Sequence, residues 1–406
     1  MTGAVVVSGL GTLGSYGVGA ASLAQALRTS VPCVSEVDRS GGYHAPEGAR
    51  LAALVQGVDF SALLKPAAAR RMCGPSRMSV AAARMAVRDA GLEATRDGWD
   101  DCEVVLSTVF GPVDFTERLL AAITRDGPET ASPFHFTESV ANAPTAQIAI
   151  EFQARGPNVT LTQREAGPLI AISRAARDVA AGRAVRALAG SVEEMTPLVH
   201  GLLDRFGGLA RRTAEDVEAS RPFDRRRNGI LAGEGASVLV IEREVDVRAR
   251  GGRVLARVRG GASAFDPTAS RIGWGHGAQS LAGAAQRMLE RLGLDAGDID
   301  LMVSGASGAS AGDRLEAEIL ARLFTGRRMP PVLAPKSITG EYGGGSLAAA
   351  VLAVGGGEFG PTAGFTEADP ALRLTPHAGG RLAGGRVLVS SLAAGGAGAW
   401  LVLEQP

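Results

Sequence analysis

Residues 163–168 occupy a turn at which a predicted strand leads directly into a predicted helix. The β-branched run 159–162 indicates the strand, and apolar residues at helical spacing up to Gly182 indicate the helix. Such a turn exposes one side chain above free backbone N–H groups and the positive end of the helix dipole, which suits a catalytic nucleophile. The apex holds no Ser, Cys or Thr, and its charged side chains are Arg164 and Glu165.

The composition is that of a globular protein without a nucleic-acid or membrane signature. The chain has 406 residues, of which 46% are hydrophobic, enough for a substantial core in one large α/β unit or two domains. Its 42 basic and 42 acidic residues leave no net charge, so nothing favours nucleic acid or an anionic membrane. Because the sequence has neither a signal-like start nor an apolar run of membrane-spanning length, we expect a soluble cytoplasmic protein.

The spacing of cysteines and histidines predicts neither a metal site nor a bound cofactor. The three cysteines are widely separated and form no CxxC pair, which suits a reducing compartment. The five histidines are scattered without HxH or HExxH spacing. We therefore expect no metal and no cofactor.

Two helix-and-strand patterns occur twice along the chain. Segments 79–111 and 280–308 each read as an amphipathic helix, a Gly-Leu stop, an acidic loop and a buried strand. Segments 156–182 and 332–353 each read as a strand, a turn and a helix of small residues. The shared order, at a spacing of about 200 residues, predicts a duplicated α/β unit.

We place the boundary between the two predicted halves after residue 245, so that they comprise residues 1–245 and 246–406. The apolar strand 236–242 would close the first half. Two further strands near the end of the chain, at 386–390 and 399–404, would close the second half.

Residues 220–242 carry a long and specific motif. They closely resemble the segment SRPFD-x-x-R-x-G-x-x-x-GEGA of β-ketoacyl synthases, the condensing enzymes of fatty acid and polyketide assembly. The resemblance extends over nearly the whole chain, through the short motifs at 6–11, 156–157, 312–318, 335–340 and 394–398. It implies a thiolase-like, duplicated αβαβα layered fold.

By this resemblance the chain has lost all three residues that family members use in condensation, a Cys on the elbow and two His. An ungapped alignment across 156–182 puts Glu165 at the cysteine position. An alignment fixed only on the motif residues beside the elbow would put Arg164 there; we favour Glu165. The first histidine position falls on Gly305 and the second on Glu341. A carboxylate cannot replace the thiolate as an acyl carrier, so the chain alone should not condense acyl groups.

Other family positions are altered or retained. The gate loop, usually GFGG, carries Ala394 where a phenylalanine is usual. Asp313, Glu316 and Lys336 match retained positions, for which structural ion pairing is as good an interpretation as catalysis. A carboxylate at a helix N-terminus, as predicted for Glu165, is also favourable without any catalysis.

A ketosynthase scaffold that lacks the Cys and the two His resembles the chain-length factor, or ketosynthase β subunit, of bacterial type II polyketide synthases. The resemblance implies a heterodimer with a catalytic ketosynthase α subunit and a growing chain carried by acyl carrier protein. These subunits usually carry Gln at the cysteine position, where this chain has Glu165. That departure leaves open the branches of the family that make reduced polyene chains.

The resemblance also places interface and tunnel residues. Segment 142–148 is expected at the subunit interface. The residues after the strand that leads to this interface are candidates for the tunnel end and for control of chain length: Phe110, Val113, Phe115 and Thr116.

Two other functions are compatible with the sequence. The first is a malonyl-thioester decarboxylase in which Glu165 or Glu341 acts as acid, base or oxyanion-side group. The second is a homodimeric scaffold that binds acyl chains without a ketosynthase partner.

Overall fold

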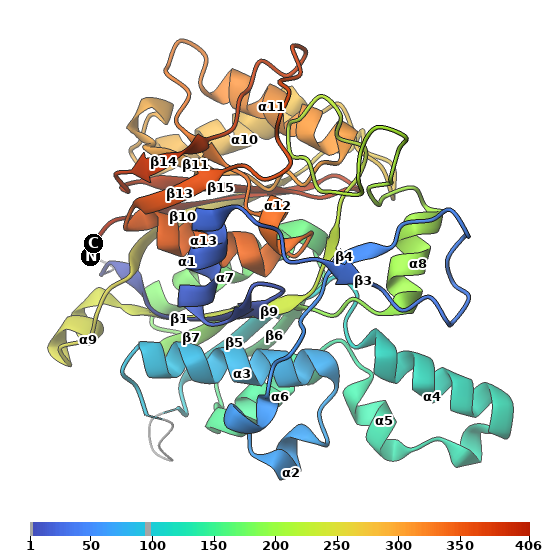
Figure 1. Ribbon diagram of the computed structural model, residues 1–406. Coiled ribbons are helices and arrows are strands. Elements are labelled where there is room, and N and C mark those ends of the chain that lie inside the picture. Colours follow the sequence, from blue (N-terminus) through green and yellow to red (C-terminus); the bar gives the residue numbers. More distant parts are fainter. Residues whose placement is uncertain (1–2, 94–98) are drawn as a thin grey trace.

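A computed structural model describes residues 3–93 and 99–406, which fold around one large mixed sheet (Figure 1). Ten strands of this sheet follow one another in space, and an eleventh, β2 (Gly17–Val18), pairs with the edge of β1. The spatial order is β12 (Val332–Leu333), β11 (Leu301–Val303), β15 (Val387–Leu392), β16 (Ala397–Glu404), β10 (Ala256–Phe265), β1 (Val5–Gly14), β9 (Gly235–Arg243), β7 (Arg186–Glu193), β5 (Cys102–Ser107) and β6 (Asn158–Leu161).

The two halves of the sheet have the same topology. Numbered in chain order within each half, the strands run 3-2-4-5-1 from the outer edge to the centre in both. In each half the outer three strands are parallel and the inner two join antiparallel. The halves meet through a short antiparallel pairing of β1 with β10, at Val6–Arg257 and Val7–Ala256. This repetition confirms the predicted duplication, while the domain boundary after residue 245 stays a prediction.

Two helices lie between the half-sheets and form the central layer (Figure 1). They are α7 (Gly167–Ala180) and α13 (Gly343–Val354), whose buried residues belong to one core with strands of both halves. Nearly every residue of α13 is buried, and its sequence consists of Gly, Ala, Ser, Leu and Val. A helix that is apolar all round is stable only when buried, and small side chains allow sheets to approach on both sides.

Outer helices cover the two remaining faces of the sheet. One face is covered by α3 (Gly74–Asp89) and α6 (Ala143–Phe152), and the other by α10 (Ala278–Arg291) and α11 (Ser310–Leu323). The result is the layer order helix, sheet, helix, sheet, helix. None of the described helices is both long and apolar enough to cross a membrane.

The remaining elements are short or peripheral. In Figure 1, α4 and α5 project from the body as a helical pair. The full set of short or peripheral elements is α1 (Ala20–Thr29), α2 (Pro66–Ala69), α4 (Val113–Asp126), α5 (Pro133–Glu138), α8 (Pro197–Arg205), α9 (Glu244–Ala249), α12 (Lys336–Thr339), the sheet of β3 (Ser35–Glu36), β4 (Leu51–Ala53) and β8 (Ala232–Gly233), and the pair β13 (Gly357–Pro361) and β14 (Ala378–Leu382).

Most predicted elements are present, with shifted ends. The strand predicted at 159–162 runs from Asn158 to Leu161. The buried strand predicted at the end of segment 280–308 is short, because β11 ends at Val303 and the chain continues as a loop to α11. That loop, and not a strand, carries Gly305.

Candidate functional site

The turn between β6 and α7 is a sharp elbow. A single 3₁₀ turn, η3 (Arg164–Ala166), joins the strand to the helix, and Pro168 stands in the first turn of α7. Gly167 is required by packing, because a Cβ there would lie 2.9 Å from the Cβ of Ser107. Arg164 has φ 48°, a left-handed conformation that non-glycine residues rarely adopt and that often marks functional turns.

The structure brings the three predicted triad positions to one cavity. Glu165 comes from the elbow, Gly305 from the loop after β11, and Glu341 from the three residues between α12 and α13. All three line a cavity of about 470 Å³. Their predicted correspondence to the family triad stays a prediction, but the geometry required for it is present.

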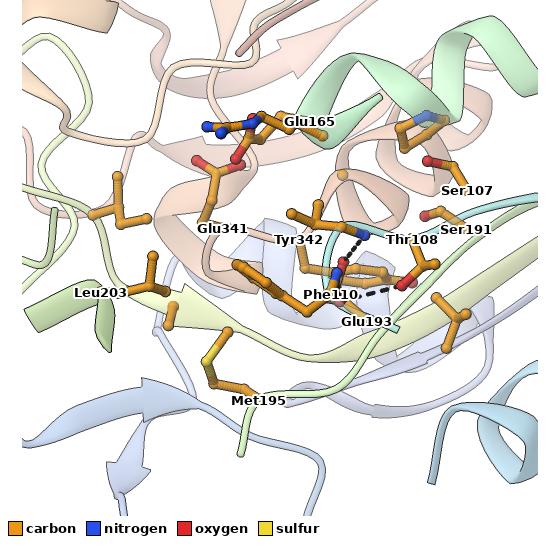
Figure 2. Close-up of a pocket in the computed structure, with 17 residues that line it drawn as sticks. Ser107, Thr108, Phe110, Glu165, Ser191, Glu193, Met195, Leu203, Glu341 and Tyr342 are labelled. Atoms are coloured by element: carbon orange, nitrogen blue, oxygen red, sulfur yellow. Dashed lines mark hydrogen bonds between the residues drawn. The ribbon is translucent and has the colours of Figure 1, made fainter. Parts of the chain in front are cut away.

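The carboxyl groups of Glu165 and Glu341 point toward each other in Figure 2. Glu341 forms an ion pair with Lys336, whose side chain is almost completely buried. The Oε2 atom of Glu165 is buried and has no hydrogen-bond partner within the described structure. One carboxyl group of the pair is therefore neutralised by the protein, and the other is not.

Burial and the neighbouring Glu341 raise the pKa of Glu165 to about 7, against the opposing effect of Lys336. An ordinary glutamate is ionised at neutral pH, whereas this one exists as both acid and carboxylate. Glu165 can therefore donate a hydrogen bond in one form and hold a cation in the other. Neither form supplies a thiolate.

Two of the retained acidic residues have well-defined structural contacts. Asp313 accepts hydrogen bonds from the backbone N–H groups of Phe223 at 2.8 Å and of Ser307 and Gly308 at 3.2 Å. These bonds connect α11 to the loop that carries Gly305 and to the motif at 220–242. Burial raises the pKa of Asp313 to about 7. Such contacts are those of a scaffold residue.

Glu316 has a similar role one turn further along α11. Its carboxylate accepts hydrogen bonds from the hydroxyl groups of Ser304, at 2.8 Å, and of Ser390. Ser304 directly follows β11 and Ser390 lies in β15, so Glu316 connects two neighbouring strands at the cavity. Burial raises its pKa, and the serine hydroxyls and Lys336 oppose that shift.

Glu193, at the end of β7, is a site residue that the sequence interpretation missed. Its carboxylate accepts hydrogen bonds from the N–H groups of Val109 at 2.7 Å and Phe110 at 3.1 Å, and from the Thr108 hydroxyl at 3.3 Å (Figure 2). Burial raises its pKa to about 8. The available signal was a pair of acidic residues, Glu193 and Glu194, directly after a buried apolar run.

The four tunnel candidates lie in two places. Phe110 lines the cavity and is 39% exposed. Val113 packs beside a small core cluster, and Phe115 contacts the ring of His135 at a centroid distance of 5.3 Å. The Thr116 hydroxyl donates to backbone carbonyls at 3.0 Å. The last three belong to α4 and lie outside the cavity lining, and their role at a tunnel end stays a prediction.

The gate position lies at the same cavity. Ala394 lines it, in the turn between β15 and β16. A small side chain at this point leaves space that a phenylalanine would fill. Around the cavity stand several strongly exposed apolar residues, including Phe206 at 70% and Ile272 at 66%.

In the part of the chain that the structure describes, no group of three or more His, Cys, Asp and Glu residues could hold a metal ion. The acidic residues of the cavity are arranged instead around Lys336, backbone N–H groups and serine hydroxyls.

Comparison with known proteins establishes the family. Residues 2–246 match the model of the β-ketoacyl synthase N-terminal domain, and residues 255–366 match that of the C-terminal domain. The chain belongs to the β-ketoacyl synthase family. The elbow, the duplicated sheet and the cavity described above are thus those of a β-ketoacyl synthase scaffold in which Glu165, Gly305 and Glu341 line the pocket.

Individual relatives include polyketide and fatty acid proteins. The tetracenomycin polyketide synthase ketoacyl synthase beta subunit of Streptomyces glaucescens is 31% identical, over 91% of this chain and 90% of its own length. The 3-oxoacyl-[acyl-carrier-protein] synthase 2 of Vibrio harveyi is 28% identical, over 99% of this chain and 98% of its own length.

Among solved structures, the ishigamide ketosynthase/chain length factor superposes with a TM-score of 0.88 and 26% identity, covering 100% of this chain and 99% of that chain. The predicted thiolase-like layered fold and the resemblance to ketosynthase β subunits are therefore confirmed.

Proposed function

We propose that this protein is a non-catalytic chain-length factor, which pairs with a catalytic ketosynthase α subunit and shapes the tunnel for a polyketide growing on acyl carrier protein. The observation that carries the proposal is Glu165 at the elbow. Condensing enzymes need a thiolate at this turn to hold the acyl chain as a thioester, and a carboxyl group cannot form that thioester.

The two histidine positions support the same conclusion. Gly305 has no side chain to offer a hydrogen bond to a thioester oxygen or a developing enolate. A Cβ at this position would lie 2.9 Å from the carbonyl oxygen of Ser390. The loop therefore leaves little space for a side chain at residue 305. Glu341 is committed to its ion pair with Lys336.

The outer edge of the first half-sheet is suited to pairing with another chain. Strand β6 is hydrogen-bonded only to β5 within the described sheet, so its other edge presents free N–H and C=O groups. Exposed apolar residues stand close to this edge in sequence, among them Val140 at 38% and Ile150 at 68%. They flank the segment 142–148 that we propose at the subunit interface.

Co-expression with a ketosynthase that retains the Cys-His-His triad tests the proposal. We expect a stable 1:1 complex that elongates malonyl units on acyl carrier protein, while neither chain alone does so. Glu165→Ala should leave elongation by the complex intact, whereas replacing the partner's elbow cysteine by alanine should abolish it. The second variant is the matched control, because it changes the equivalent position of the other chain.

Other outcomes would assign a different function. Decarboxylation of malonyl-carrier protein by this chain alone, lost in Glu165→Gln, would make it a decarboxylase; the titration of Glu165 near neutral pH is the feature that favours this alternative. A stable homodimer that binds acyl chains and ignores the ketosynthase would make it a scaffold protein.

A further inference from the structure

The cavity of this chain is open and well formed. Its volume of about 470 Å³ lies in the range of small-molecule sites in proteins. Most of its wall is apolar, with contributions from α8, the strand ends and the loop before α10: Leu202, Leu203, Phe206, Ile230, Trp274 and Leu392.

The polar part of the cavity is strongly acidic. Among its lining residues, four carry carboxyl groups and one, Arg164, carries a guanidinium group. Asp313 is satisfied by backbone N–H groups, Glu316 by serine hydroxyls and Glu341 by Lys336. The guanidinium group of Arg164 donates to the backbone carbonyl of Arg271 at 3.1 Å.

Glu165 is the exception in this set. Its Oε2 atom is buried and unpartnered. The two cations that act on it already have other partners, since Lys336 is paired with Glu341 and Arg164 donates to the Arg271 carbonyl. A buried carboxylate oxygen without a partner is unfavourable, because that atom has lost its hydration without gaining a hydrogen bond. A ligand that brings a cationic donor would remove this deficit, whereas an anionic ligand would add to the negative charge.

We propose that the cavity binds an apolar molecule that ends in a protonated amine, with the ammonium group held by Glu165 and the hydrocarbon lying against Leu203, Phe206 and Ile230. The proposal concerns a site within this chain and does not rest on its pairing with a ketosynthase. The same acidic wall excludes the free carboxylate of a malonyl group.

Three probes of equal chain length test the charge preference: octylamine, octanol and octanoate, titrated calorimetrically into the full chain, or into its complex with the partner, at neutral pH. We expect octylamine to bind about tenfold more tightly than octanol, the effect of one hydrogen bond to a charged group, and octanoate to bind most weakly. In Glu165→Gln, the advantage of octylamine over octanol should disappear, while octanol binding stays unchanged.

Octanol binding by Glu165→Gln also reports that the cavity is still formed in the variant. Glu290→Gln, which changes an exposed carboxylate on α10 outside the cavity, is the matched control and should retain the amine preference. Equal binding of all three probes to the wild type, no binding of any probe, or an amine preference that survives in Glu165→Gln would each overturn the proposal. Tighter binding of the ketone 2-octanone than of octylamine would also overturn it, because Glu165 would then act as a neutral hydrogen-bond donor.

Discussion

Glu341 and Lys336 form an ion pair that is shielded from solvent, with 10% of the glutamate side chain and 1% of the lysine side chain exposed. Lys336 begins the short helix α12 and Glu341 lies two residues after its end, so the pair fixes the chain just before it enters the central helix α13. It thereby determines how Glu341 faces Glu165.

Lys336→Met should strongly destabilise the protein, because it leaves Glu341 buried without its cation. Removing one partner of a buried pair lowers the free energy of unfolding by about 3–5 kcal/mol. The double variant Lys336→Met, Glu341→Gln should recover much of this loss, since the uncompensated charge is gone. Urea unfolding of both single variants and the double variant measures the coupling. A double variant no more stable than Lys336→Met would contradict the prediction.

Stability should fall as the pH rises from about 5 to about 8. Burial raises the pKa of Glu193 from 4.5 to about 8. In this window the folded protein keeps a proton that the unfolded chain has released, so the free energy of unfolding decreases by up to about 1.4 kcal/mol per pH unit for this group. Glu193→Gln should make the decrease shallower, as measured by urea unfolding across the window.

Part of the pH dependence should remain in Glu193→Gln. The pKa values of Glu165, Glu194 and Asp313 are each raised to about 7, mainly by burial, and they act with the same sign. A slope unaffected by Glu193→Gln would show that the carboxyl group of Glu193 is ionised in the folded protein.

Gly305→Ala should lower the free energy of unfolding by about 1–3 kcal/mol, the usual effect of overpacking. The new Cβ would lie 2.9 Å from the Ser390 carbonyl oxygen and 3.0 Å from Ser391 Cα. Gly355→Ala is the control, since its Cβ would have only an ordinary contact, at 3.8 Å from the Leu352 carbonyl oxygen. Thermal unfolding of both variants measures the difference, and equal stability of the two would mean that the loop around residue 305 adapts freely.

Phe110→Ala and Phe115→Ala should separate a role in the pocket from a role in packing. Phe110 is partly exposed at the cavity, so its replacement should change product length in the complex with little effect on stability. Phe115 is buried between α4 and α5, so its replacement should cost about 3–5 kcal/mol of stability. Product analysis by mass spectrometry and urea unfolding report the two effects. A change in chain length with Phe115→Ala alone would place the tunnel end in α4 instead.

The sequence by itself determined the family, the duplication and the residue types at the three altered positions. Motifs such as 220–242 are local, and the helix and strand patterns depend on neighbours along the chain, so both can be read without coordinates. Element ends were less well determined, as in β11, because the length of a strand depends on which partners it finds.

Only the tertiary structure decided which of these residues meet. Glu165 and Glu341 lie far apart in sequence and are brought together where α7 and α13 enter the central layer. The burial that raises the pKa of Glu165, the missing partner of its Oε2 atom and the position of Glu193 arise from packing between distant segments. Local spacing does not encode these contacts. The family resemblance grouped Phe110, Val113, Phe115 and Thr116 by position in the sequence, and only the tertiary structure shows that Phe110 is the one of the four that lines the cavity.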